Sequence, residues 1–281
     1  MEYVKLEEIC TIVSGGTPSR SKPDYWNDGN IPWIKIKDMK SKYIDSAEEF
    51  ITEEGLNNSS TKMLKSDTIL YSIFATLGEV GILKIDACTN QAIAGLSLKE
   101  DSNILKEYLY YYLKSKKKDV NNLGRGVAQN NINLSLLRKF KIPVIPLHQQ
   151  KKIIGVLDNV SNTINNYERE IELLDELVKA RFMEMFGDPV SNSKDLPIQK
   201  MNNVAPICQY DGSFEERVWL LNLDMVESQT GRIINYNIVG KDAIGGSVCT
   251  FDENNILYSK LRPYLNKVVI PNGKWYATSE L

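Results

Sequence analysis

The stretch QQKKIIGVLDNVSNTINNYEREIELLDELVKARFMEMF, residues 149–186, decides how this chain folds. From Ile153 to Val178 its apolar side chains recur at alternating steps of four and three residues. This spacing is typical of a helix that packs lengthwise on another helix. We therefore predict one long helix over residues 147–187, with an apolar seam for a partner helix. The seam residues are Leu157, Val160, Ile164, Ile171, Leu174 and Val178.

Both ends of this helix are marked in the sequence. Pro146 precedes the start, and Gly187, Asp188 and Pro189 follow the end. At about 1.5 Å per residue, the quoted stretch would be roughly 57 Å long. A buried helix of an ordinary bundle is the alternative, but such helices are usually about 8–20 residues long.

The overall composition indicates a globular protein. A chain of 281 residues predicts about two domains. No apolar run reaches the length of a membrane span, and the N-terminus lacks the apolar core of a signal peptide. We therefore expect a cytoplasmic protein. The four cysteines are scattered, which favours free structural thiols over a disulfide framework or a zinc site. They are Cys10, Cys88, Cys208 and Cys249.

The charge is unevenly distributed along the chain, whose formal net charge is −2. Residues 1–146 hold 20 Lys and Arg against 18 Asp and Glu, and the remaining residues hold 14 against 18. Neither part has the basic bulk charge of a typical nucleic-acid binder. Any affinity for DNA must therefore come from a local patch or be shared with a partner.

An internal repeat divides the chain. Four blocks recur in the same order, separated by a similar number of residues each time. We predict two related domains, residues 1–146 and 198–281, joined by the long helix and by a polar linker over residues 188–197. The paired blocks are Lys5–Ile9 with Lys200–Val204, Trp33–Met39 with Trp219–Met225, Asp67–Ser72 with Asn254–Ser259, and Thr89 with Thr278.

The second copy ends three residues after Thr278, at Leu281, whereas the first copy continues far beyond Thr89. We therefore expect the second domain to be incomplete. In the first copy, residues 6–13 predict a short helix or turn that leads into a loop. Alternating and apolar runs predict strands, and helical spacing predicts short helices. The fold class is α+β: two repeated mixed α/β domains joined by a long coiled-coil-type helix. The predicted strands cover residues 33–36, 68–74, 81–85 and 92–98, with helices at 105–115 and 134–139 and an extended segment at 142–146.

Enzyme signatures are mostly missing from the sequence. It has no adenine-methyltransferase motif and no Walker motif, and His148 is its one histidine. Asp24, Asp38 and Lys40 fit the loose pattern of magnesium-dependent nucleases, but Val226 stands where the second copy would need the lysine. We expect no catalytic residue, no bound cofactor and no metal in this chain.

One candidate DNA-contacting region is the loop Ser14–Lys22 and the strand after it. Small residues and Thr17, Arg20 and Lys22 could bring donors to a phosphate. Lys35 and Lys37 alternate onto one face of the following strand. An ordinary surface loop and a solvated strand face are the alternatives.

A second candidate region is the loop at residues 123–133. Arg125 is the residue type that reads guanine with two hydrogen bonds, and Gln129, Asn130 and Asn131 are types that read adenine. Purely local hydrogen bonding in an asparagine-rich turn is the alternative.

The order of several motifs is also informative. The motifs are Val4–Leu6, Ser14–Ser19, Ile31–Ile34 with Asp38-Met39, Asp67–Ser72 with Gly78 and Gly81, Asn90–Ala94, Gly124 and Gly126 with Gln129, and Ile142–Gln150. With these motifs in this order, the chain resembles the DNA specificity subunit of type I restriction–modification enzymes along its whole length.

The resemblance implies two target recognition domains separated by a central conserved helix, each reading half of a split DNA sequence. It implies a distal helix that pairs with the central one, and that helix would be missing here. It implies that the chain is non-catalytic and brings methyltransferase subunits and a restriction/translocase subunit to double-stranded DNA. S-adenosylmethionine, ATP and magnesium would belong to those partners.

Two functional hypotheses follow. The first is sequence-specific DNA recognition, with Arg125, Gln129, Asn130, Arg20 and Lys35 as base or backbone contacts. The second is a coiled-coil scaffold without a DNA role. In either case we expect a second helix to cover the seam, supplied by a further segment or by self-association with another copy of the chain.

Overall fold

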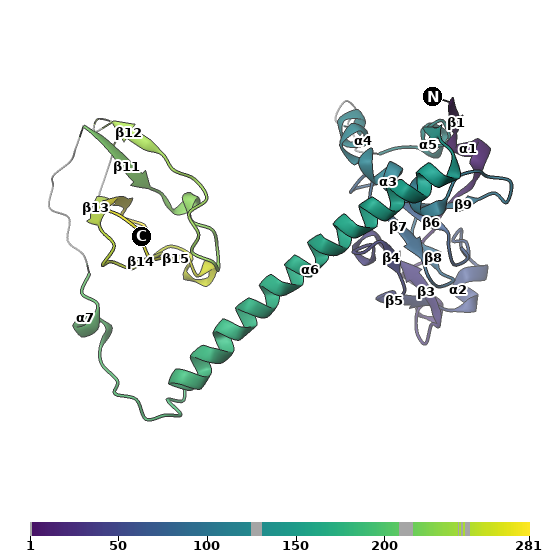
Figure 1. Cartoon of the computed structure of the whole chain (residues 1–281). Helices are drawn as coiled ribbons and strands as arrows, with labels where there is room; N and C mark the ends of the chain where they lie inside the picture. The colour runs from purple at the N-terminus through teal and green to yellow at the C-terminus, as the bar shows by residue number, and fades with distance from the viewer. Residues whose placement is uncertain (1, 125–130, 208–215, 241, 243, 245–247) are drawn as a thin grey trace. The chain divides into compact units, whose positions relative to one another are not determined.

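The computed structural model describes residues 2–124, 131–207, 216–240, 242, 244 and 248–281. The chain forms two compact units, Met1–Lys179 and Ala180–Leu281, each with its own sheets and buried clusters (Figure 1). None of the described helices is both long enough and apolar enough to cross a membrane.

A five-stranded sheet lies at the centre of the first unit, in the order β2-β9-β6-β7-β4. Neighbouring strands are antiparallel, except that β4 and β7 run parallel. All residues of β6 and β7 are buried. Successive side chains enter different clusters: Ile69 and Tyr71 lie in one, and Leu70 lies in the other. The strands are β2 (Cys10–Ser14), β4 (Tyr43–Ile44), β6 (Ile69–Ser72), β7 (Val80–Leu83) and β9 (Ile93–Leu98).

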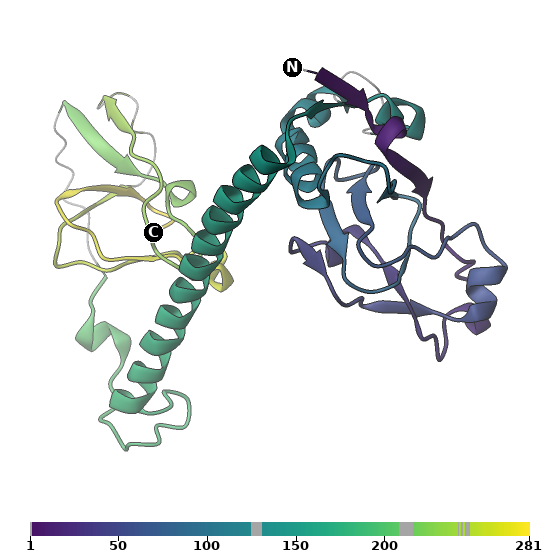
Figure 2. The same ribbon diagram turned by 45° about the vertical axis from the view of Figure 1, so that its right-hand side comes forward.

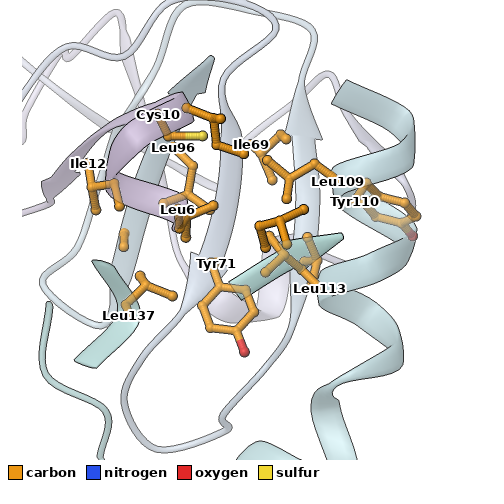
Figure 3. Packing of buried hydrophobic residues seen from close by; sticks show 14 of the residues in the cluster. Leu6, Cys10, Ile12, Ile69, Tyr71, Leu96, Leu109, Tyr110, Leu113 and Leu137 are labelled. Carbon is orange, nitrogen blue, oxygen red and sulfur yellow. The ribbon is translucent and has the colours of Figure 1, made fainter. Parts of the chain in front are cut away.

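Short helices supply several further residues of the cluster around Tyr71, part of which Figure 3 shows. Leu6, Leu109 and Leu137 come from three different helices, and each is fully buried. The helical spacing predicted around Leu109 is confirmed, because Tyr108 and Leu113 are buried on the same face. The helices are α1 (Leu6–Ile9), α3 (Lys106–Ser115), α4 (Lys117–Gly124) and α5 (Leu134–Arg138).

Two smaller sheets complete the first unit, in the orders β5-β3-β8 and β1-β10. Strand β3 pairs antiparallel with β5 and parallel with β8. Trp33 of β3 is buried, and its indole N–H donates to the carbonyl of Gly16 at 3.0 Å. The remaining elements are β1 (Glu2–Lys5), η1 (Pro23–Tyr25), β3 (Ile31–Ile34), η2 (Ile36–Asp38), β5 (Glu49–Ile51), α2 (Glu53–Asn57), β8 (Cys88–Thr89) and β10 (Lys141–Val144).

The second unit has a four-stranded sheet, in the order β12-β11-β16-β13, and a two-stranded sheet of β14 and β15. Its main apolar cluster contains Trp219, Leu221 and Phe251. The elements are α7 (Met201–Val204), β11 (Arg217–Leu221), η3 (Leu223–Met225), β12 (Ile238–Gly240), β13 (Val248–Phe251), β14 (Leu257–Tyr258), η5 (Pro263–Leu265), β15 (Val268–Val269) and β16 (Trp275–Thr278).

The structural counterpart of the sequence repeat is visible in strand pairing. Strand β3 leads into η2 and pairs parallel with β8, and β11 leads into η3 and pairs parallel with β16. The amide of Asp38 donates to the carbonyl of Lys35, and the amide of Met225 donates to the carbonyl of Asn222. These bonds match Asp38 with Met225, one residue away from the sequence match of Asp38 with Asp224. In the structure, η2 and η3 therefore correspond by their backbone hydrogen bonds, and this correspondence is shifted by one residue from the alignment of identical residues.

Helix α6 (Leu147–Phe186) is one continuous helix of 40 residues, as the heptad pattern predicts (Figures 1 and 2). It would be about 60 Å long at the usual rise per residue. It ends at Gly187, which has a φ of +75° and donates its amide to the carbonyl of Met183 at 2.8 Å. This left-handed glycine satisfies a carbonyl that the last turn would otherwise leave unpaired.

The first turns of α6 are attached to the first unit by Gln150, whose side chain is fully buried. Its Oε1 accepts from the amide of Leu105 at 2.8 Å. Its Nε2 donates to the carbonyls of Asn103 at 2.8 Å and Ile145 at 2.9 Å. One turn later, Ile154 packs against the cluster around Tyr71.

The seam residues of α6 differ from Gln150 and Ile154 in their exposure to solvent. Leu157 is half-buried, whereas Val160, Ile164 and Ile171 are exposed, with 60% of Ile171 accessible. Leu174 and Val178 are also exposed. No described residue of the first unit covers the seam after Ser161. The predicted partner helix for the seam stays a prediction.

The local secondary structure differs from the sequence prediction at several strand ends: the strands predicted over residues 68–74 and 81–85 are β6 (Ile69–Ser72) and β7 (Val80–Leu83). Two further differences have identifiable causes. Residues 10–13 were expected to belong to a helix or turn, but they form β2, because they pair with β9. The strand expected over residues 33–36 ends at Ile34. The carboxylate of Asp38 accepts from the amide of Lys35 at 2.7 Å, which favours the 3₁₀ turn η2 instead of further strand.

Cys10 and Cys88 are buried free thiols, in agreement with the predicted structural role. Burial raises the pKa of Cys10 to about 12 and that of Cys88 to about 11. Both side chains therefore remain protonated at neutral pH, and a protonated thiol is a poor nucleophile and metal ligand. Cys208 lies outside the described residues.

Candidate nucleic-acid interface

The loop Ser14–Lys22 runs against the ends of β8 and β9. The amide of Gly15 donates to the carbonyl of Ile93 at 3.1 Å, and the amide of Gly16 donates to that of Thr89 at 2.9 Å. A Cβ at either glycine would come within 3.0 Å of neighbouring atoms, so only glycine fits this close approach. Thr17, a predicted contact, donates its hydroxyl to the Gln91 side chain.

Arg20 and Lys35, both predicted DNA contacts, meet at one carboxylate. Arg20 Nη2 lies 2.5 Å from Glu49 Oε2, and Lys35 Nζ pairs with the other oxygen of Glu49. The Arg20 guanidinium also stacks on Trp26, with its Cζ 3.5 Å from the ring centroid. Trp26 and Trp33 contact edge to face at 5.0 Å. The aromatic rings and the carboxylate thus hold the guanidinium in one orientation.

The surrounding charges are largely compensated. Burial alone would raise the pKa of Glu49, but hydrogen bonds from Lys35 and Arg20 outweigh it and lower that pKa. Lys37, another predicted contact, pairs with Glu48, which raises the pKa of the lysine. The three cations therefore face two carboxylates. A phosphate can contact them only by sharing these cations with Glu48 and Glu49.

Lys22 has a different partner. Its Nζ donates to the Tyr25 hydroxyl at 2.8 Å and lies 4.8 Å from the centre of that ring. The hydrogen bond to Tyr25 raises the pKa of Lys22, so this exposed lysine keeps its charge at neutral pH.

Three of the strongest sequence candidates, Arg125, Gln129 and Asn130, lie outside the described residues, so their roles stay predictions. Asn131, the fourth residue of that group, is described and forms an isolated antiparallel bridge with Phe74. The amide of the next residue, Ile132, donates to the carbonyl of Ile73 at 2.9 Å.

Sequence reasoning did not assign a structural role to three residues of the first unit. One is Gln150, whose role as the buried clamp of α6 depends on backbone groups from distant segments. Another is Asp158, which accepts from the Tyr111 hydroxyl at 2.5 Å and pairs with Lys42. The third is Phe74, which the sequence predicts to lie in a strand and the structure places in the turn between β6 and β7. Extending the sequence repeat beyond Ser72 would have drawn attention to this turn.

One carboxylate of the nuclease pattern has a structural role. Asp38 serves η2 through its hydrogen bond to the amide of Lys35. Within the part of the chain that the structure describes, no group of three or more His, Cys, Asp and Glu residues is placed to hold a metal ion.

Comparison with known proteins adds a direct result. Residues 1–175 match the family model described as the type I restriction modification DNA specificity domain. The EcoR124I/EcoR124II specificity subunit of Escherichia coli is 34% identical over 183 residues, covering 62% of this chain and 45% of that protein. The MjaIX specificity subunit of Methanocaldococcus jannaschii is 31% identical over 209 residues, covering 72% and 48%. This chain spans about half the length of these curated relatives.

A solved structure confirms the predicted fold class. It comes from work on complex assembly and conformational transition of the type I R-M system, and it superposes with a TM-score of 0.52 at 20% identity. The match covers 64% of this chain and 43% of the other. The mixed α/β architecture, the long helix and the matched family model agree with the resemblance drawn from the sequence. The chain belongs to the family defined by the type I restriction modification DNA specificity domain.

Proposed function

We propose that this chain is a sequence-specific DNA-binding specificity subunit of a type I restriction–modification system. It directs adenine methylation and DNA cleavage by partner subunits to a bipartite site. The observation that carries the proposal is the repeat: related strand, turn and hairpin elements occur before and after one long helix. Two related readers on one chain suit two half-sites separated by a fixed distance. The family membership does not favour the alternative of a scaffold without a DNA role.

The base-reading residues of the proposal are Arg125, Gln129, Asn130 and Asn131. Their side chains are the types that form paired hydrogen bonds with guanine and adenine in the major groove. The cluster of Arg20, Lys22, Lys35 and Lys37, with Thr17, would contact the DNA backbone and fix the register of the domain.

The partners of the proposal supply the chemistry. Methyltransferase subunits transfer a methyl group from S-adenosylmethionine to adenine, and a restriction/translocase subunit uses ATP and magnesium. The specificity subunit itself contributes recognition and spacing. The complex would act on DNA in the cytoplasm, and exposed seam residues from Ile164 to Val178 would pair with a helix in the assembly.

The decisive experiment is to co-express the full-length gene with its methyltransferase and to map adenine methylation. We expect a split motif, one half of which changes when residues 1–146 are exchanged for those of a relative. Random methylation, or a motif unaffected by the exchange, would contradict the proposal.

A point variant tests the base-reading residue directly. Arg125→Ala should lose about 1–3 kcal/mol of discrimination at one guanine, because a good bidentate pair contributes about that much. Arg138→Ala, at an exposed arginine in the last turn of α5, is the matched control and should leave the motif unchanged. Equal behaviour of the two variants would remove Arg125 from the base-reading set.

A further inference from the structure

The turn after β6 and the turn after β14 are built alike. Ser72 is the last residue of β6, and Ser259 immediately follows the last residue of β14; both serines are buried. The amide of Ser72 donates to the carbonyl of Glu79 at 2.9 Å, and the amide of Ser259 donates to that of Lys267 at 3.1 Å. Each serine hydroxyl also donates to a carbonyl within its own turn. A buried serine therefore closes both turns, although its hydroxyl bonds the carbonyl of Thr76, four residues on, in the first turn and that of Leu261, two residues on, in the second.

Both turns contain a left-handed residue with a side chain at the same position. Ala75 has a φ of +61°, and Arg262, which also lies three residues after its serine, has a φ of +50°. A second left-handed residue closes each turn: Gly78 at +79° and Asn266 at +46°. Left-handed backbone is unfavourable for a residue with a Cβ, and it persists where the surroundings fix it.

Different neighbours support the two turns. In the first, Asn121 of α4 donates to the carbonyl of Leu77 at 3.3 Å, and Lys117 pairs with Glu79 at 2.5 Å. In the second, the backbone amide of Gln229 donates to the carbonyl of Leu265 at 3.0 Å. The turn geometry is thus common to both units although its supports are not.

Each turn exposes one apolar side chain, on the residue just before its first left-handed residue. Phe74 immediately precedes Ala75 and is 47% exposed, and Leu261 immediately precedes Arg262 and is 50% exposed. A single exposed apolar side chain is ordinary on a protein surface. Here, however, an apolar residue occurs at the same position of two strained turns. The Phe74 backbone is additionally fixed by its bridge to Asn131.

We propose that Phe74 and Leu261 are matched apolar wedges, each of which inserts against a base step in one DNA half-site. This inference rests on the proposed function. Methylation of a base within a duplex requires that base to leave the stack, and apolar side chains such as Phe and Leu unstack base steps in other DNA-binding proteins. An inserted side chain can separate stacked bases only if its backbone stays in place. The closed, strained turns provide that rigidity.

The experiment uses the chain assembled with its methyltransferase subunits and a duplex carrying the mapped split motif. A 2-aminopurine base, which fluoresces when unstacked, replaces one base at a time in either half-site. Phe74→Ala should bind about ten-fold more weakly, equivalent to about 1.4 kcal/mol. It should also lose the fluorescence increase at the first half-site only. Leu261→Ala should do the same at the second half-site only.

Three further variants make the result specific. Phe74→Leu keeps an apolar wedge and should retain most of the affinity and fluorescence change. Leu136→Ala and Ile270→Ala remove other exposed apolar side chains, one in each unit, and should bind like the unaltered protein.

The outcomes separate this inference from the proposed function. If the unaltered complex methylates a split motif but Phe74→Ala and Leu261→Ala behave like the two controls, the wedge is wrong and the function stands. If Phe74→Ala and Phe74→Leu lose their methyltransferase subunits, the turn is a protein contact and the wedge is also wrong. If the unaltered complex recognises no motif, both proposals fall.

Discussion

The two halves of helix α6 share one heptad pattern but have different surroundings. The half from Leu147 to Ser161 is held to the first unit by the buried Gln150, the packed Ile154 and the paired Asp158. Beyond it the apolar side chains are exposed, and 68% of Val178 is accessible. The pattern therefore predicts which side of a helix is apolar, whereas the distribution of polar anchors decides which part of it docks on its own domain.

The largest expected effect is at Gln150. Gln150→Ala removes three hydrogen bonds and leaves the amide of Leu105 and two carbonyls without partners, which should cost about 3 kcal/mol of unfolding free energy. Gln149→Ala, at the exposed neighbour, should cost under about 0.5 kcal/mol. Urea unfolding and hydrogen exchange at the Leu105 amide measure both. Equal losses for the two variants would mean that Gln150 is not the clamp.

The next test replaces one isoleucine by alanine in each half of helix α6. Ile154→Ala should destabilise the first unit by about 1.5 kcal/mol, because this partly buried side chain packs on the cluster around Tyr71. Ile171→Ala should change the stability of the isolated chain by under about 0.5 kcal/mol. A comparable loss at Ile171, together with a dimer in sedimentation, would show that another copy covers the seam in solution.

The smallest effect depends on pH. Burial alone would raise the pKa of Asp158, but hydrogen bonds from Lys42 and Tyr111 outweigh it, so the folded pKa lies below the usual 3.8. The stabilisation is therefore present above the unfolded pKa and is lost as the pH falls through the folded pKa. Asp158→Asn should cost about 1 kcal/mol at pH 7, given the partial exposure of the pair.

The difference between unaltered protein and Asp158→Asn should shrink as unfolding is measured at successively lower pH below 5. Asp175→Asn, on the exposed half of the helix, is the control. A difference that stays constant across this range would show that the ion pair does not attach the helix.

Much of the architecture could be predicted from the sequence because it depends on local periodicity. The heptads of α6 and the apolar spacing of α3 are examples. Strand β2 was missed because pairing with β9, some eighty residues away in sequence, overrides the local preference of Cys10 to Ser14. The one-residue shift of η3 against η2 likewise depends on hydrogen bonds that residue identity does not reveal.

The candidate interface was less predictable, because its electrostatics come from long-range pairing. Lys35 and Arg20 were chosen by residue type, and nothing local shows that both meet Glu49. That meeting follows from the β3–β5 register, which places Glu49 opposite Trp33. The roles of Arg125, Gln129 and Asn130 stay predictions, since they require the geometry of a bound duplex.

The exposed seam of α6 should also affect how quickly the protein is degraded in a cell. Contiguous apolar side chains, such as Ile171, Leu174 and Val178, are the surface that chaperones and proteases use to sort incomplete proteins. A copy whose seam stays uncovered should be degraded faster than one whose seam is occupied. The abundance of this chain would then follow the supply of whatever covers the helix, so that production is matched to assembly without a separate regulator.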